Sequence, residues 1–136
     1  MSLKRIEMKY GRIVPSIETP AVVIANGKKV NVIAVWDTGS THTAITQCVA
    51  NELGAPLHGG VNAHTMGGYV NHKFCTVSLE LGGYIRVTGD ILCTPSSLSS
   101  DGRIGLIIGM DIISLGDFRI KNSNGKTVMT FEVENN

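Results

Sequence analysis

The sequence predicts a single, mainly β domain, and three observations indicate this fold class. Apolar and polar residues alternate over short stretches, which is the period of a strand with one buried face. Turn-forming pairs such as Asn26-Gly27 separate these stretches, and only one segment has the apolar spacing of a longer helix. A chain of 136 residues has the length of one domain, and we expect residues 1–136 to form it.

The first expected elements form a β-hairpin. Residues 21–25 are a short apolar run, Asn26-Gly27 is a strong signal for a two-residue turn, and residues 30–36 return as the partner strand. The second strand is apolar on both faces near its end. We therefore expect that end to be buried between layers.

One helix is expected directly after this hairpin. Apolar residues recur at helical spacing over residues 43–53. Ser40 or Thr41 is suited to the N-cap, and Gly54 to the position after the last turn.

The rest of the chain returns to strands. Residues 56–72 are rich in glycine and predict an irregular hairpin, and a short helical turn is expected over residues 110–114. The remaining strands are separated by turns at Gly82-Gly83 and Asn124-Gly125 and by a polar loop over residues 96–102. These strands are expected at residues 74–81, 84–87, 91–93, 104–108, 118–121 and 127–133.

Composition excludes several classes of protein. A hydrophobic fraction of 43% with a formal net charge of +1 excludes extensive disorder and gives no indication of a nucleic-acid partner. No stretch has the length of a membrane span, so no membrane partner is expected. The first twenty residues contain no continuous apolar segment of a secretory signal, and we therefore expect a cytoplasmic protein.

Cysteine and histidine offer the alternative of a metal or thiolate site. The cysteines are odd in number and widely spaced, which predicts reduced thiols, most of them buried. No spacing among these residues matches a zinc-ligand pattern, so no metal and no cofactor is expected. The residues concerned are Cys48, Cys75, Cys93, His42, His58, His64 and His72.

The stretch VWDTGSTHTAI carries the strongest functional signal. Asp37 follows an apolar strand, and Thr38, Gly39 and Ser40 follow it directly. Asp37 is therefore expected where a buried strand ends and a loop begins. Two further motifs come later in the chain, Thr65-Met66-Gly67-Gly68-Tyr69 and Leu106-Ile107-Ile108-Gly109.

In this order, the three motifs resemble those of the retroviral-type aspartic proteases, the single-domain retropepsins. The resemblance covers residues 18–134 and implies a closed β-barrel-like acid protease fold with a glycine-rich flap hairpin and one or two short helices. It implies catalytic roles for Asp37, Thr38 and Gly39. It also implies that substrate contacts Ser40, Met66, Gly67, Gly68 and Ile107.

The chemistry of this family explains why a carboxylate is needed. Two carboxylates about 3 Å apart share one proton because both cannot ionise, and the pair then serves as base and acid toward water and the peptide carbonyl. The chain contains a single D-T-G motif. An active enzyme would therefore be a homodimer with one Asp37 from each chain, and its partners would be peptide or protein substrates. The terminal segments, residues 1–8 and 127–133, are candidates for the interface.

Several alternatives remain open at this point. The domain is either an aspartic endopeptidase or a catalytically silent module for dimerisation or peptide binding. Asp111 is expected to cap backbone donors or to pair with Arg103 or Arg119, and not to complete the dyad. Ser40 is expected to hydrogen-bond the Asp37 carboxylate, whereas many retroviral members have alanine there. Residues proposed to line a substrate cleft are Ile45, Val61, Ile91 and Ile107.

Overall fold

The computed structural model describes residues 2–65, 68–83, 85–95 and 97–135; for residues 2, 61–65, 68–71 and 135 it describes the backbone alone. The described part contains two short helices, α1 (Gln47–Leu53) and α2 (Met110–Ile113). Its strands are β1 (Ser2–Lys9), β2 (Ile17–Ala25), β3 (Lys28–Trp36), β4 (Ala44–Thr46), β5 (His58–Thr65), β6 (Gly68–Leu81), β7 (Ile85–Thr94), β8 (Ile104–Ile108), β9 (Asp117–Ser123) and β10 (Lys126–Asn135).

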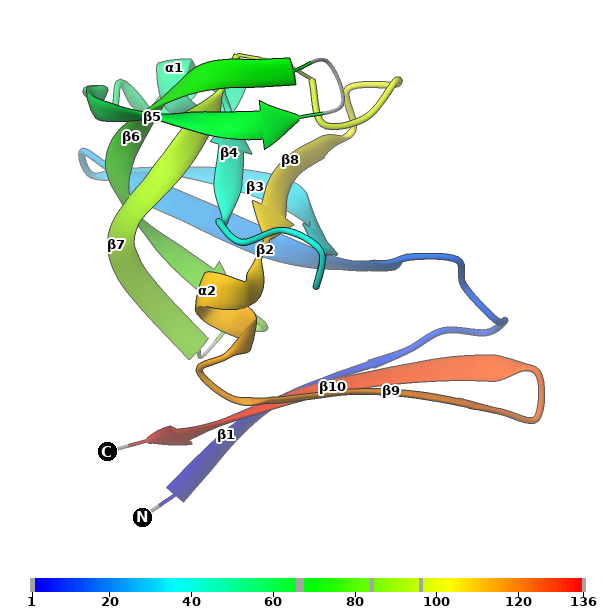
Figure 1. Cartoon of the computed structure of the whole chain (residues 1–136). Helices are drawn as coiled ribbons and strands as arrows, with labels where there is room; N and C mark the ends of the chain where they lie inside the picture. The colour runs from blue at the N-terminus through cyan, green and yellow to red at the C-terminus, as the bar shows by residue number, and fades with distance from the viewer. Residues whose placement is uncertain (1, 66–67, 84, 96, 136) are drawn as a thin grey trace.

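Six of these strands close into a barrel. They are hydrogen-bonded in the order β2-β3-β8-β4-β7-β6, and pairing of β6 with β2 completes the ring. β5 pairs with β6 alone, so the β5–β6 hairpin extends this sheet over the top of the barrel (Figure 1). The structure confirms the prediction of a mainly β fold with a closed barrel and two short helices.

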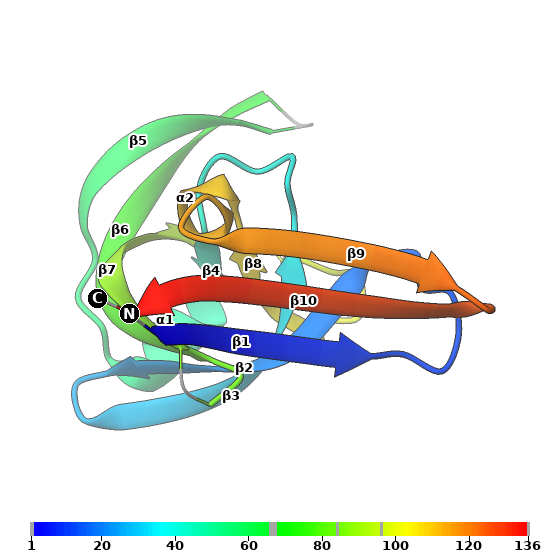
Figure 2. The same cartoon turned by 90° about the horizontal axis from the view of Figure 1, so that it is seen from below.

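A second, three-stranded sheet brings the chain ends together. β10 lies between β1 and β9, and all neighbours are antiparallel. This terminal sheet lies below the barrel, and the described chain ends meet at one end of it (Figures 1 and 2). Trp36 joins the two parts, because its ring stacks on Phe118 of β9 at 5.3 Å and contacts Phe131 of β10 at 5.0 Å between centroids. Its Nε1 donates to Thr19 Oγ1 and its side chain is only 6% exposed, so Trp36 packs between the two parts.

Two predicted hairpin turns are confirmed. Asn26 and Asn124 both have φ of 53°, and each is followed by a glycine with positive φ. Two consecutive residues with positive φ match the right-handed twist of the strands that they connect. β2 also begins earlier than expected and includes Pro20, which is tolerated because β6 pairs with β2 only from Ala21 onward.

The helix prediction is wrong at its N-terminal end. Residues 44–46 form strand β4, which pairs with both β7 and β8, so α1 begins only at Gln47. Thr46, and neither Ser40 nor Thr41, is the N-cap, and its Oγ1 accepts from Val49 N at 3.2 Å. Tertiary pairing here overrides local helix spacing. Gly54 ends the helix as predicted, with φ of 62°.

One strand was predicted as two. Residues 85–87 and 91–93 belong to the single strand β7, because it pairs without interruption with β6 from Leu81↔Ile85 to Lys73↔Cys93, and residue 84 lies outside the described residues. Among the described residues, neither helix has the length and apolar character needed to cross a membrane.

Candidate active site

Asp37 lies in a loop that begins where β3 ends. Its backbone N–H donates to the carbonyl of Ile108 at the end of the adjacent parallel strand β8, at 2.9 Å. Its side chain is partly exposed, and Oδ1 accepts from the N–H of Gly39 at 2.8 Å. A Cβ on Gly39 would lie 3.2 Å from that oxygen. The loop therefore holds the carboxylate by backbone contacts and leaves its second oxygen without a protein partner among those described.

The other side of this loop is fixed to the start of α2. The N–H of Met110 donates to the carbonyl of Ser40 at 2.8 Å, and the N–H of Asp111 to that of Thr41 at 3.3 Å. Gly109 makes this approach possible, because a Cβ there would lie 2.7 Å from the carbonyl of His42. Two stretches that are 70 residues apart in sequence thus form one rigid unit around Asp37.

Asp111 completes this connection and has the structural role expected of it, but the backbone donor that it caps lies outside α2. Its carboxylate accepts from Thr43 N at 3.0 and 3.1 Å and from Thr43 Oγ1 at 2.6 Å. Thr43 is fully buried, and its Oγ1 in turn accepts from the N–H of Gly109 at 3.0 Å. Asp111 therefore binds the loop of Asp37, and it does not cap α2, whose N-cap Gly109 has no side-chain hydrogen bond.

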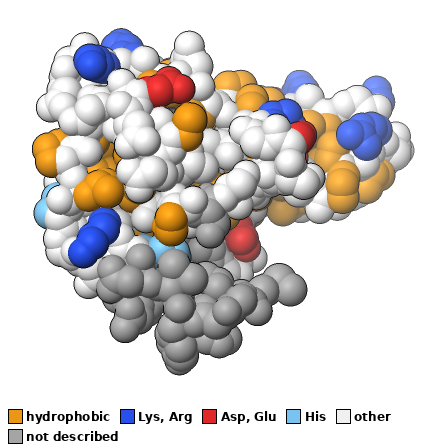
Figure 3. Space-filling model, turned by 90° about the horizontal axis from the view of Figure 1, so that it is seen from above, with side chains coloured by type: hydrophobic (Ala, Val, Ile, Leu, Met, Phe, Trp, Pro, Cys, Tyr) orange, Lys and Arg blue, Asp and Glu red, His pale blue; other side chains and the backbone are white. Residues whose placement is uncertain are grey.

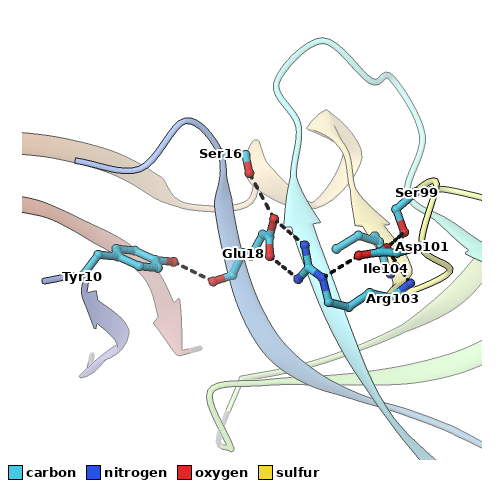
Figure 4. Close-up of polar contacts among 7 residues, drawn as sticks. All are labelled: Tyr10, Ser16, Glu18, Ser99, Asp101, Arg103 and Ile104. Atoms are coloured by element: carbon cyan, nitrogen blue, oxygen red, sulfur yellow. Dashed lines mark hydrogen bonds and ion pairs between the residues drawn. The ribbon is translucent and has the colours of Figure 1, made fainter. Parts of the chain in front are cut away.

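The two arginines proposed as partners of Asp111 lie elsewhere. Arg119 pairs with Asp117, and Arg103 pairs with Glu18 of β2 and with Asp101 in its own loop (Figure 4). The hydrogen bond from Arg103 lowers the pKa of Glu18 below its ordinary value. This network ties the loop that precedes β8 to the outside of the barrel.

The residues that follow Asp37 have different surroundings from those expected. Ser40 Oγ donates to the carbonyl of His42 at 2.8 Å and makes no described hydrogen bond to the Asp37 carboxylate. Thr38 is exposed on the loop. The predicted flap residues Met66 and Gly67 lie outside the described residues, and Gly68 is described only as the first residue of β6, paired with Thr65.

Ile107 lies in a row of apolar residues on one face of the barrel sheet. In β8 it is partly exposed, whereas its neighbours Leu106 and Ile108 are fully buried. Alternation along β3 places Asp37 on the same face as Val35, opposite Trp36, and Val35 is paired with Ile107. We call this set the outer row; its members are paired across five strands in the order Val35, Ile107, Ala44, Leu92 and Phe74.

The outer row contains Ala44, Leu92 and Phe74, whereas the sequence analysis named Ile45 and Ile91 as candidates to line a cleft. Ile45 has no exposed surface and Ile91 is 4% exposed, and both belong to the barrel core. The signal was the period of two: in a strand, a residue next to one that faces the core points the other way. The side chain of Val61 is outside the described residues. Seen from above, apolar side chains reach the surface in several places (Figure 3).

Thiolate and metal chemistry have little support in the described part of the chain. Burial raises the pKa of Cys75 to about 11 and also raises that of Cys93, so both are protonated near neutral pH. Cys48 is exposed, whereas Cys75 and Cys93 are buried, as expected for most of the three thiols. The described residues contain no group of three or more His, Cys, Asp or Glu that could hold a metal ion.

Comparison with known proteins places the chain in a family. The family model described as aspartyl protease matches residues 20–112, which is more than half of the chain. The chain belongs to the aspartyl protease family. A search of curated proteins found no match.

Solved structures show that the fold is that of the retropepsins. A retropepsin-like aspartic protease from Rickettsia conorii is 17% identical with a TM-score of 0.63, and the match covers 97% of this chain and 96% of that one. EIAV protease complexed with the inhibitor HBY-793 is 21% identical with a TM-score of 0.56, over 73% of this chain and 86% of that one. The resemblance read from the three sequence motifs is thus confirmed for family and fold.

Proposed function

We propose that this aspartyl protease family member is an endopeptidase active as a homodimer, with water activated between two Asp37 carboxylates, one from each chain. The observation that carries the proposal is the geometry of the Asp37 loop. Backbone hydrogen bonds from β8 and α2 fix the loop, while the Asp37 carboxylate stays partly exposed and accepts only from Gly39 among the described contacts. A carboxylate held in this way is available to share a proton with a second one.

In the proposed reaction, the ionised member of the pair removes a proton from water as it attacks the peptide carbonyl. The protonated member donates to the carbonyl oxygen, and the pair titrates as one unit. Thr38, exposed beside Asp37, is proposed to join the two loops across the dimer axis. Ser40, Met66, Gly67, Gly68 and Ile107 are proposed to contact substrate, and Ile107 shares its sheet face with Asp37.

Two observations support a dimer. The sequence has one D-T-G motif, and the carboxylate of Asp111 is engaged by Thr43, so it is not available to complete a dyad within the chain. The terminal sheet and the segment after α2 also expose large apolar side chains: Leu3 is 62%, Leu115 58% and Ile120 49% exposed. We propose that the terminal segments form the interface with a second copy.

The three free cysteines fit a reducing compartment, and we propose the cytoplasm as the place of action. A net charge of +1 gives no electrostatic indication of a nucleic-acid partner, and we propose peptides or proteins as the partners.

The test is cleavage of a peptide library between pH 4 and 8, read by mass spectrometry, with Asp37→Asn as the matched control. The asparagine keeps the acceptor for the Gly39 N–H but cannot act as acid or base, so cleavage by the wild type should disappear. Sedimentation of both proteins checks that each is a folded dimer. A folded wild-type dimer that cuts nothing would contradict the proposal and favour a silent dimerisation or peptide-binding module.

A further inference from the structure

His72 is a buried residue that the fold does not explain. It lies on β6 and is only 8% exposed, yet its Nδ1 is buried and has no hydrogen-bond partner among the described residues. An unpaired buried polar atom destabilises a fold, and an apolar side chain of similar size would avoid that cost. A ring nitrogen left unpaired in this way indicates a partner outside the described part of the chain.

The ring belongs to the sheet face that carries the outer row. On β6, Cys75, Val77, Leu79 and Leu81 have at most 2% exposure and point into the core. Side chains alternate along a strand, so His72 is on the opposite face, two residues from Phe74. Phe74 is paired with Leu92 in the outer row. His72 thus lies in the row next to this apolar row.

On the β7 side, the residues beside His72 are polar and small. Lys73 is paired with Cys93, so the same register places Thr94 across from His72, and Thr94 is itself paired with Thr46 of β4. Thr94 is 6% exposed. An apolar row from Ile107 to Phe74 is therefore bordered by a buried polar row that contains one unsatisfied atom.

This arrangement is typical of a recognition site. Ligand sites are mostly apolar, with few polar groups that fix orientation. A site built to hydrogen-bond a substrate group strongly disfavours substrates that lack the group, because its buried polar atom then stays unpaired.

We propose that His72 determines substrate specificity, a proposal that rests on the endopeptidase function above. A substrate side chain places its apolar part on the outer row, and its uncharged polar end hydrogen-bonds to His72 Nδ1. The preferred class is a residue with an apolar stem and an amide or hydroxyl end, such as glutamine, asparagine, threonine or tyrosine. His72 acts by contact with substrate and takes no part in bond cleavage.

Three variants of His72 test this proposal. His72→Leu keeps the bulk and removes the polar atom. His72→Asn and His72→Gln are a matched pair, because the asparagine amide reaches the place of Nδ1 whereas the glutamine amide reaches that of Nε2. Each variant is compared with wild type in two measurements: the melting temperature, and kcat/KM for peptide pairs that differ only in whether one side chain ends in an amide or hydroxyl or in a methyl group.

The expected result is a change in preference without loss of folding. His72→Leu should melt at or above the wild-type temperature, and its kcat/KM for the polar-ended peptides should fall about tenfold relative to their apolar partners. His72→Asn should restore the preference, and His72→Gln should not.

Two results would overturn the inference alone while wild type still cleaves: an unchanged preference in His72→Leu, or an equal loss of stability and of cleavage of both peptide classes. A folded wild-type dimer without cleavage would overturn the endopeptidase proposal, and this inference with it. The two failures are therefore distinguishable.

Discussion

The two faces of the barrel sheet carry residues that are adjacent in sequence on the same strands but differ in burial. On the inner face, a row paired across β3, β8, β4 and β7 has at most 2% exposure and forms part of the core. On the outer face, four of the five members of the outer row are partly exposed. The inner row consists of Ala34, Leu106, Ile45 and Cys93.

This difference separates stability from proposed function. Both rows are apolar, so composition does not distinguish them, but only the outer row shares its face with Asp37. Residues of the inner row should be needed for folding. Residues of the outer row are less constrained by folding and are available for the proposed contact with substrate. Once the strand register is known, the position of a residue in the sequence assigns it to one row or the other.

The largest expected effect on stability comes from truncating the side chains of two adjacent residues, one from each row. Leu106→Ala should lower the free energy of unfolding by about 2–5 kcal/mol, because it leaves a cavity in a fully buried site. Ile107→Ala, in a partly exposed site, should lower it by about 1 kcal/mol or less. Urea unfolding measures both. Equal losses would show that the two faces do not differ in this way.

The next effect concerns the junction between the outer row and the Asp37 loop. Gly109→Ala places a methyl group within 2.7 Å of the backbone at His42, so the loop must move. We expect a loss of about 1–3 kcal/mol in unfolding free energy and a larger fractional loss of cleavage than of folded protein. Gly89→Ala is the control, since a Cβ there meets nothing within 4 Å. Equal stability and equal cleavage in the two variants would contradict the close contact between Gly109 and the backbone of His42.

Removal of the Asp111 carboxylate should have a similar or smaller effect. Asp111→Ala leaves the N–H and hydroxyl of buried Thr43 without their acceptor, which should cost about 1–3 kcal/mol in unfolding free energy. Asp111→Asn keeps one acceptor oxygen and should lose less. Urea unfolding compares the two, together with amide exchange at Thr43. If alanine and asparagine were equally tolerated, Asp111 would not hold the loop.

The smallest effect is expected far from both rows, at Glu18. Its pKa is lowered by Arg103, so the pair stabilises the fold fully above the ordinary glutamate value of 4.5, and this is lost as pH falls through the lowered pKa. The side chain of Arg103 is exposed and that of Glu18 is partly exposed, so Glu18→Gln should cost less than about 1 kcal/mol at pH 7 and nothing at pH 2. Thermal melts at both pH values measure this. A larger loss of stability at pH 2 than at pH 7 would show that the ionised Glu18–Arg103 pair is not the source of the stabilisation.

Local sequence signals predicted turns in both sheets and the end of one helix. Asn-Gly pairs placed two hairpin turns, and Gly54 placed the end of α1, because these residues tolerate positive φ. The family resemblance rested on three motifs in order, and Asp37 and Ile107 come from two of them. Long-range pairing produced the errors: residues 44–46 have helical spacing, but β7 and β8 recruit them as a strand.

The sequence by itself determined the turns, the strand character and the position of the single catalytic-type aspartate, because each depends on the conformational or chemical properties of a few adjacent residues. Tertiary structure alone decided which apolar residues face Asp37 and which partner Asp111 takes. Ile45 and Ala44 are adjacent and both apolar, and only pairing with β7 and β8 assigns them to opposite faces. Asp111 meets Thr43 across 68 positions, a contact that depends on closure of the barrel.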